Sequence, residues 1–113
     1  MHGPIALLVS DPAVLSSLQF ALSVEGFHLT AAVDDLAAAA LVIDQGYRGD
    51  GLGALIAMRG RGYSAAAIIL ATNPTPSFRA QVAGAGALVI EKPLLGDELS
   101  SAIAHALQRR KAA

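Results

Sequence analysis

The sequence predicts an α/β fold in which a doubly wound parallel sheet carries helices on both faces, and three observations predict it. Four short runs are continuously apolar, as are strands buried on both faces of a parallel sheet. Segments with the helical spacing of apolar residues lie between these runs. Each run ends at a polar or turn residue, so that strand and helix alternate in right-handed βαβ units.

The strands are expected from the apolar runs. These are Ile5–Val9, Ala40–Ile43, Ala67–Leu70 and Ala87–Ile90. The mixed segment Phe27–Ala32 is a weaker candidate whose character suits an edge of the sheet. Together they predict a five-stranded sheet.

The clearest helix is Pro12–Glu25, because proline suits the first helical position and Gly26 lies just past the end. The other predicted helices are Leu52–Arg59, Ser77–Ala85 and Asp97–Lys111. Between the second and third strands there is only the segment Val33–Ala39, whereas parallel neighbours need a crossover of about a dozen residues. We therefore expect either that the helix connecting the second and third strands is shortened or missing, or that the edge strand is displaced.

Composition limits the classes of function. The 113 residues, 54% hydrophobic and 15% charged, predict one domain over residues 1–113 with a core of its own. A net charge of −1 gives no strong attraction to nucleic acid or to an anionic membrane. The longest apolar run, Leu36–Ile43, is too short to span a bilayer, and the chain has no cysteine. A cytoplasmic protein is the expectation.

Polar residues that carry chemistry follow the four runs. They are Ser10–Asp11, Asp44, Ala71–Thr72 and Glu91–Lys92. Ligands of such sheets bind outside the carboxyl ends of the strands, so we expect these side chains to converge there. Two adjacent carboxylates repel unless a cation such as Mg²⁺ lies between them, and a lysine and a hydroxyl suit phosphoryl oxygens. These residues describe a phosphorylatable aspartate site.

These motifs resemble those of the receiver domain of two-component response regulators, the CheY-like family, over nearly the whole chain. Asp11 in LLVSDP, Asp44 in LVIDQGYRGDGL and Lys92-Pro93 in LVIEKPL match the family's motifs in order and spacing. The resemblance implies a flavodoxin-like fold and a phosphoryl group accepted on Asp44 from a histidine kinase or phosphotransfer protein. It also implies Mg²⁺ held by Asp11, Asp44 and the Gly46 carbonyl, with Lys92 neutralising the transferred group.

Several positions depart from the family pattern. Ser10 stands in the place of the first acid, which predicts weaker Mg²⁺ binding. The family's phosphate-contacting hydroxyl falls on Ala71, with Thr72 one step later, and a kink after Thr72 would be needed to bring its hydroxyl to the site. The switch aromatic falls on Val89. The resemblance further implies a cis bond between Lys92 and Pro93.

Simpler interpretations of the same residues stay open. Asp11 can be an ordinary N-cap, Asp44 can end a strand before a turn, and Lys92 can be an exposed lysine. For the whole chain the leading hypothesis is a signalling domain, not an enzyme, that acts through a downstream protein target and permits a homodimer. The alternatives are a pseudo-receiver that binds proteins without being phosphorylated, and a small cofactor carrier of flavodoxin type.

Overall fold

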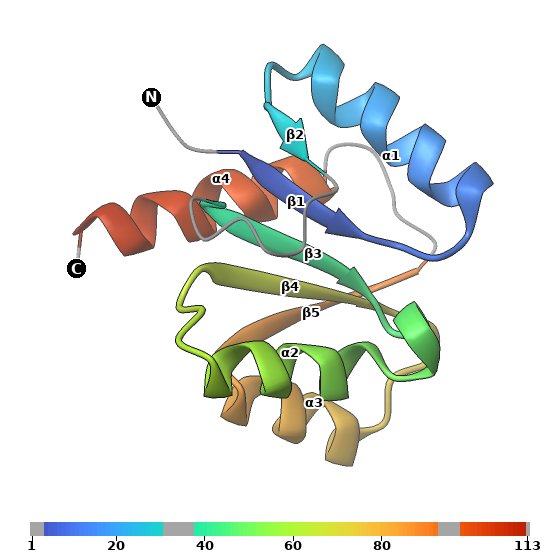
Figure 1. Cartoon of the computed structure of the whole chain (residues 1–113), viewed down its shortest axis with the longest axis vertical. Coiled ribbons are helices and arrows are strands. Elements are labelled where there is room, and N and C mark those ends of the chain that lie inside the picture. The colour runs from blue at the N-terminus through green and yellow to red at the C-terminus, as the bar shows by residue number, and fades with distance from the viewer. Residues whose placement is uncertain (1–3, 31–37, 93–97, 113) are drawn as a thin grey trace.

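The computed structural model describes residues 4–30, 38–92 and 98–112, and this part of the chain is an α/β fold of three layers (Figure 1). Its elements in order are β1 Ile5–Leu8, α1 Pro12–Val24, β2 Leu29–Thr30, β3 Ala40–Asp44, the short 3₁₀ helix η1 Tyr47–Gly49, α2 Gly51–Gly60, β4 Ala66–Ala71, α3 Pro76–Gly84, β5 Ala87–Glu91 and α4 Glu98–Ala112. The strands of the described part pair in parallel in the order β2-β1-β3-β4-β5. The predicted doubly wound, five-stranded parallel sheet is confirmed.

Side chains that alternate in direction along the strands divide the core into two halves, one on each face of the sheet. Ile5 and Leu7 of β1 pack in the half that holds the apolar faces of α1 and α4, and Ala6 and Leu8 pack in the half that holds α2 and α3. Successive strand residues point to opposite faces, so a continuously apolar strand supplies both halves. In Figure 1, α2 and α3 lie together on one side of the sheet, with α1 and α4 on the other.

The edges of the sheet differ from its centre. The mixed segment predicted as an edge forms β2, which pairs only with β1 among the described strands. The run that forms β5 was predicted to be buried on both faces, and this is wrong for Leu88, which is 47% exposed. The reason is that β5 is the other edge strand and that α4 packs against β4 and β3.

Side-chain caps start three helices at the carboxyl edge of the sheet. Asp11, Asp50 and Thr75 each accept a hydrogen bond from a backbone N–H in the first turn of α1, α2 and α3, respectively. Such caps satisfy donors that a helix leaves unpaired and fix where the chain turns from strand to helix. The loops that follow β1, β3 and β4 are therefore anchored at both ends.

Two expectations fall on residues outside the described part of the chain. The connection Val33–Ala39, where the helix between the second and third strands was expected to be shortened or missing, lies outside the described part except for residues 38 and 39, and the Lys92–Pro93 bond involves residue 93. Within the described residues, no helix is both long enough and apolar enough to cross a membrane.

Candidate functional site

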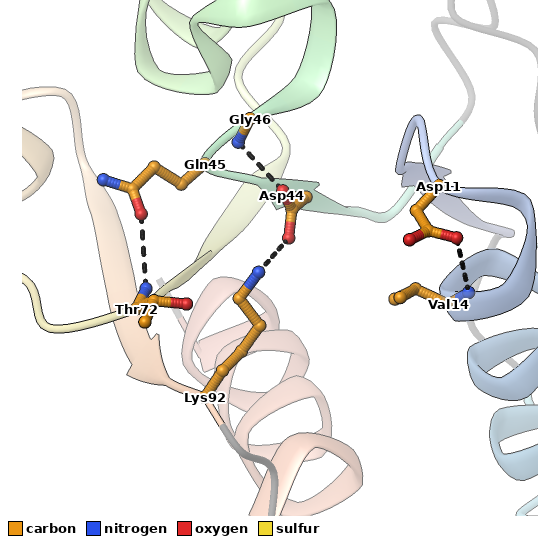
Figure 2. A network of polar contacts seen from close by, with 7 residues as sticks. All are labelled: Asp11, Val14, Asp44, Gln45, Gly46, Thr72 and Lys92. Carbon is orange, nitrogen blue, oxygen red and sulfur yellow. Dashed lines mark hydrogen bonds and ion pairs between the residues drawn. The ribbon is translucent and has the colours of Figure 1, made fainter.

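Asp44 is the last residue of β3, which lies between β1 and β4, and its side chain is 18% exposed. Its Oδ1 lies 2.7 Å from the Lys92 Nζ, and its Oδ2 accepts a hydrogen bond of 2.8 Å from the Gly46 N–H (Figure 2). Hydrogen bonds to a charged partner are the strong ones, so contacts on both oxygens fix the carboxylate. Each oxygen keeps a further lone pair for chemistry.

Lys92 reaches Asp44 because the ladder between β4 and β5 continues beyond the last strand pair. Ala71 pairs with Glu91, and the Lys92 N–H then donates to the Ala71 carbonyl at 2.8 Å. The backbone of Lys92 is thus fixed beside the end of β4, and its side chain, 33% exposed, crosses to the end of β3. The structure therefore brings into contact two residues that are 48 positions apart.

The loop after Asp44 folds back on itself. The Gln45 N–H donates to the Leu70 carbonyl of β4, and the Gly51 N–H donates to the Gln45 carbonyl, each at 2.8 Å. A Cβ atom on Gly51 would overlap the Asp44 carbonyl oxygen, so only glycine permits this close approach. The start of α2 is consequently packed against the backbone of the candidate phosphoacceptor.

Ser10 is tied to this same loop. Its Oγ accepts a hydrogen bond of 3.3 Å from the backbone N–H of Arg48, which has a φ of 51° inside η1. A residue with a side chain is uncommon in that left-handed region. The Arg48 guanidinium carbon lies 5.4 Å from the centre of the Tyr47 ring. The residue in place of the family's first acid thus connects the end of β1 to the loop after β3.

Asp11 caps α1. Its Oδ1 accepts hydrogen bonds from the N–H groups of Ala13 at 2.9 Å and Val14 at 3.4 Å. Figure 2 shows it apart from the Asp44–Lys92 pair, with no bond to either residue. The capping interpretation is therefore observed. The strand register pairs Leu8 with Ile43, so Asp11 follows the end of β1 and Asp44 is the last residue of the neighbouring β3.

Thr72 lies one residue beyond β4, whereas Ala71, the last residue of that strand, is fully buried. The next residue, Asn73, has a φ of 48°, which is the kind of kink that a contribution from Thr72 requires. The Thr72 N–H donates to Gln45 Oε1 at 3.2 Å. Neither this bond nor that of Ser10 with Arg48 was predicted from the sequence, and the available signal for Gln45 was its place directly after Asp44.

The other residues considered in the sequence form no hydrogen bond or ion pair with the Asp44–Lys92 pair within the described part. Val89 of β5 is partly buried against the core on the side of α2 and α3. Glu91 forms an exposed ion pair of 3.3 Å with Arg79 of α3. His28 and His105 are exposed, and His2 lies outside the described residues.

The oxygen donors at this edge meet the modest demands of Mg²⁺. Among the described residues, no three His, Cys, Asp or Glu side chains gather as a metal site. Mg²⁺ commonly binds through one or two carboxylates, with water and phosphate oxygens completing its shell. Asp11 Oδ2 accepts no hydrogen bond within the described part, and Asp44 keeps free lone pairs. In its chemistry the donor set fits Mg²⁺, with one carboxylate fewer than the family pattern has, because Ser10 stands in the place of the first acid.

Comparison with known proteins finds the same overall fold among solved structures. No family model and no curated protein matches the chain. Among solved structures, a CheY-like response regulator receiver domain protein from Methanospirillum hungatei JF-1 superposes with a TM-score of 0.88 at 18% identity, over 99% of this chain and 98% of that one. The beryllofluoride-activated NtrC4 receiver domain dimer gives a TM-score of 0.82 at 20% identity, over 94% and 97%.

A longer protein shares the same fold in one of its parts. NtrX from Brucella abortus superposes with a TM-score of 0.86 at 22% identity, and the match covers 99% of this chain but 29% of that one. At these identities the likeness establishes architecture. The chain has the fold of a CheY-like response regulator receiver domain, and the resemblance predicted from its motifs is confirmed at that level.

Proposed function

We propose that the chain is a two-component receiver, in which Asp44 accepts a phosphoryl group from a phosphohistidine of a histidine kinase or phosphotransfer protein. The contact of 2.7 Å between Lys92 and Asp44, at the carboxyl edge of a receiver-type sheet, is the observation that carries this proposal. A carboxylate beside a fixed ammonium suits a group that brings further negative charge.

The transfer is a displacement at phosphorus. A carboxylate oxygen of Asp44 attacks the phosphorus in line, the P–N bond to the histidine breaks, and the imidazole leaves with that bonding pair. Asp44 then carries an acyl phosphate. Lys92 neutralises the oxygens of the transferred group, and the Gly46 N–H holds the carboxylate in one orientation during the attack.

Asp11, Asp44 and the Gly46 carbonyl are the groups that would hold Mg²⁺. When bound, the ion supplies positive charge to the phosphoryl oxygens. The Gly46 carbonyl accepts a hydrogen bond of 2.9 Å from the Gly49 N–H and keeps a second lone pair for a cation.

In this proposal, the phosphorylated domain transmits its signal by contact with another protein. We propose that residues 1–113 form one receiver-like domain in the cytoplasm, which acts on a downstream protein target with no activity beyond its own phosphorylation and dephosphorylation. A homodimer accords with the proposal, because a receiver of this fold is described as a dimer in the NtrC4 structure. A place within a larger protein also accords with it, since the match to NtrX covers 29% of that chain.

A mass measurement tests the proposal. The protein is incubated with Mg²⁺ and a small phosphodonor such as acetyl phosphate, and intact mass is recorded over time. We expect the wild type to gain one phosphoryl group and the Asp44→Asn variant to gain none.

The matched control is Asp50→Asn. Asp50 is the nearest following aspartate and caps α2, a role that asparagine fills equally well. This variant should take up phosphoryl groups like the wild type. An unmodified wild type, or the same mass gain in Asp44→Asn, contradicts phosphoacceptance on Asp44.

A pseudo-receiver is the second candidate, and two observations favour it. Ala71 presents a buried methyl group where the family has a hydroxyl, and the Ser10 hydroxyl bonds the loop where the family has an acid. A protein that stays unmodified yet binds a partner equally as wild type and as Asp44→Asn would support this function.

A further inference from the structure

The side chain of Gln45 bridges two loops at the candidate site. It belongs to the loop after β3, and its Oε1 accepts the N–H of Thr72, the first residue after β4, at 3.2 Å. Figure 2 shows the amide group of Gln45 turned from Asp44 toward Thr72, with its nitrogen pointing away from the Asp44–Lys92 pair. Gln45 therefore contacts the backbone of Thr72 and not the reacting carboxylate.

Thr72 needs such a contact to have one orientation. It lies outside β4, is exposed, and precedes Asn73 at a φ of 48°, so the strand ladder does not fix its direction. In Figure 2 its hydroxyl oxygen points to the side on which Lys92 and Asp44 lie. The buried methyl of Ala71 supplies no hydroxyl at the preceding position.

We propose that Gln45 is a positioning residue, which holds Thr72 so that the threonine hydroxyl faces the phosphoryl group on Asp44. This inference rests on the proposed function. Gln45 is itself held in register, because its N–H donates to the Leu70 carbonyl of β4 and its carbonyl accepts the Gly51 N–H. The hydroxyl that Ala71 cannot supply is delivered from the next residue, and Gln45 fixes the kink that delivers it.

The test uses a substitution that keeps size and removes the acceptor. Gln45→Met should slow phosphorylation by acetyl phosphate about 10-fold, the effect expected for one hydrogen bond to a charged group. Thr72→Ala should slow it equally, and Thr72→Ser should keep the wild-type rate. The double variant should be no slower than either single variant, because each substitution already removes the contact between the Thr72 hydroxyl and the phosphoryl group. Gln81→Met, the same change on the exposed face of α3, should have no effect.

An amide readout separates positioning from simple stabilisation. We expect the Thr72 amide proton to exchange faster with solvent in Gln45→Met and to regain protection in Gln45→Glu, which keeps an acceptor oxygen. A wild-type rate in Gln45→Met, or rate losses that multiply in the double variant, would overturn the role of Gln45. A wild type that takes up no phosphoryl group would instead overturn the proposed function on which that role depends.

Discussion

At the scale of single residues, Lys92 and Asp44 depend on each other for stability as well as chemistry. Replacing Lys92 by Met leaves a carboxylate that is 18% exposed with the Gly46 N–H as its remaining partner in the described part. We expect a loss of about 1 kcal/mol in the free energy of unfolding, since the pair is partly screened by solvent. Urea denaturation measures it.

The control for this prediction is the same substitution in an Asp44→Asn background. With no charge left at position 44, Lys92→Met should cost much less, and the difference between the two losses is the coupling energy of the pair. Equal losses in both backgrounds would mean that Lys92 stabilises the fold through its aliphatic chain and not through Asp44.

Ser10 gives a second prediction at the residue scale. Ser10→Asp adds a carboxylate beside the ends of β1 and β3, so Mg²⁺ should bind more tightly, on the order of tenfold, because affinity for hard cations rises with ligand charge. Calorimetric titration with Mg²⁺ measures it. Ser10→Ala loses the bond to the Arg48 N–H without adding charge and should bind no more tightly than the wild type. An unchanged affinity in Ser10→Asp would place position 10 outside the metal site.

At the scale of elements, the close approach of α2 to β3 depends on one glycine. A Cβ on Gly51 would overlap the Asp44 carbonyl oxygen, so Gly51→Ala must push the start of α2 away from β3. We expect the free energy of unfolding to fall by about 1–3 kcal/mol, as in other overpacked sites. Phosphorylation should also be slower, because Asp44 moves. Thermal and urea denaturation report the first effect and intact mass reports the second.

Gly60, at the other end of the same helix, is the matched control. A Cβ there would meet nothing within 4 Å. Gly60→Ala should therefore keep the rate of phosphorylation and leave stability unchanged or raised by up to about 1 kcal/mol, because alanine has less freedom to lose on folding. If the two substitutions behaved alike, the packing of α2 against Asp44 would not matter.

At the scale of the whole molecule, the pattern of apolar runs was enough to predict the sheet, since a strand buried on both faces must be continuously apolar. Leu88 was mispredicted because an edge strand and a central strand can share one local pattern. The pairing of Asp44 with Lys92 could be foreseen because parallel strands end at one edge of the sheet.

Other contacts could not be predicted from the pattern of residues in the sequence. The bond from Thr72 to Gln45 and the bond from Arg48 to Ser10 depend on side-chain directions within loops. Arg59 of α2 donates to the carbonyls of Tyr63, Ala65, Ala85 and Gly86, which belong to segments far apart in the chain. Nothing in the residues around it specifies those partners, because they are backbone atoms that any sequence possesses.

The whole fold should respond to the proposed cation, because a ligand that binds only the folded state stabilises all of it. At a Mg²⁺ concentration of about 100 times the dissociation constant, the free energy of unfolding should rise by about 2.7 kcal/mol. The thermal midpoint should rise with Mg²⁺ concentration and return to its starting value when a chelator is added. Asp44→Asn removes one donor and should shrink the rise, and Asp11→Asn, which keeps the cap on α1, should shrink it independently. A midpoint that ignores Mg²⁺ in the wild type would exclude the cation from this edge of the sheet, whatever the phosphorylation assay gives.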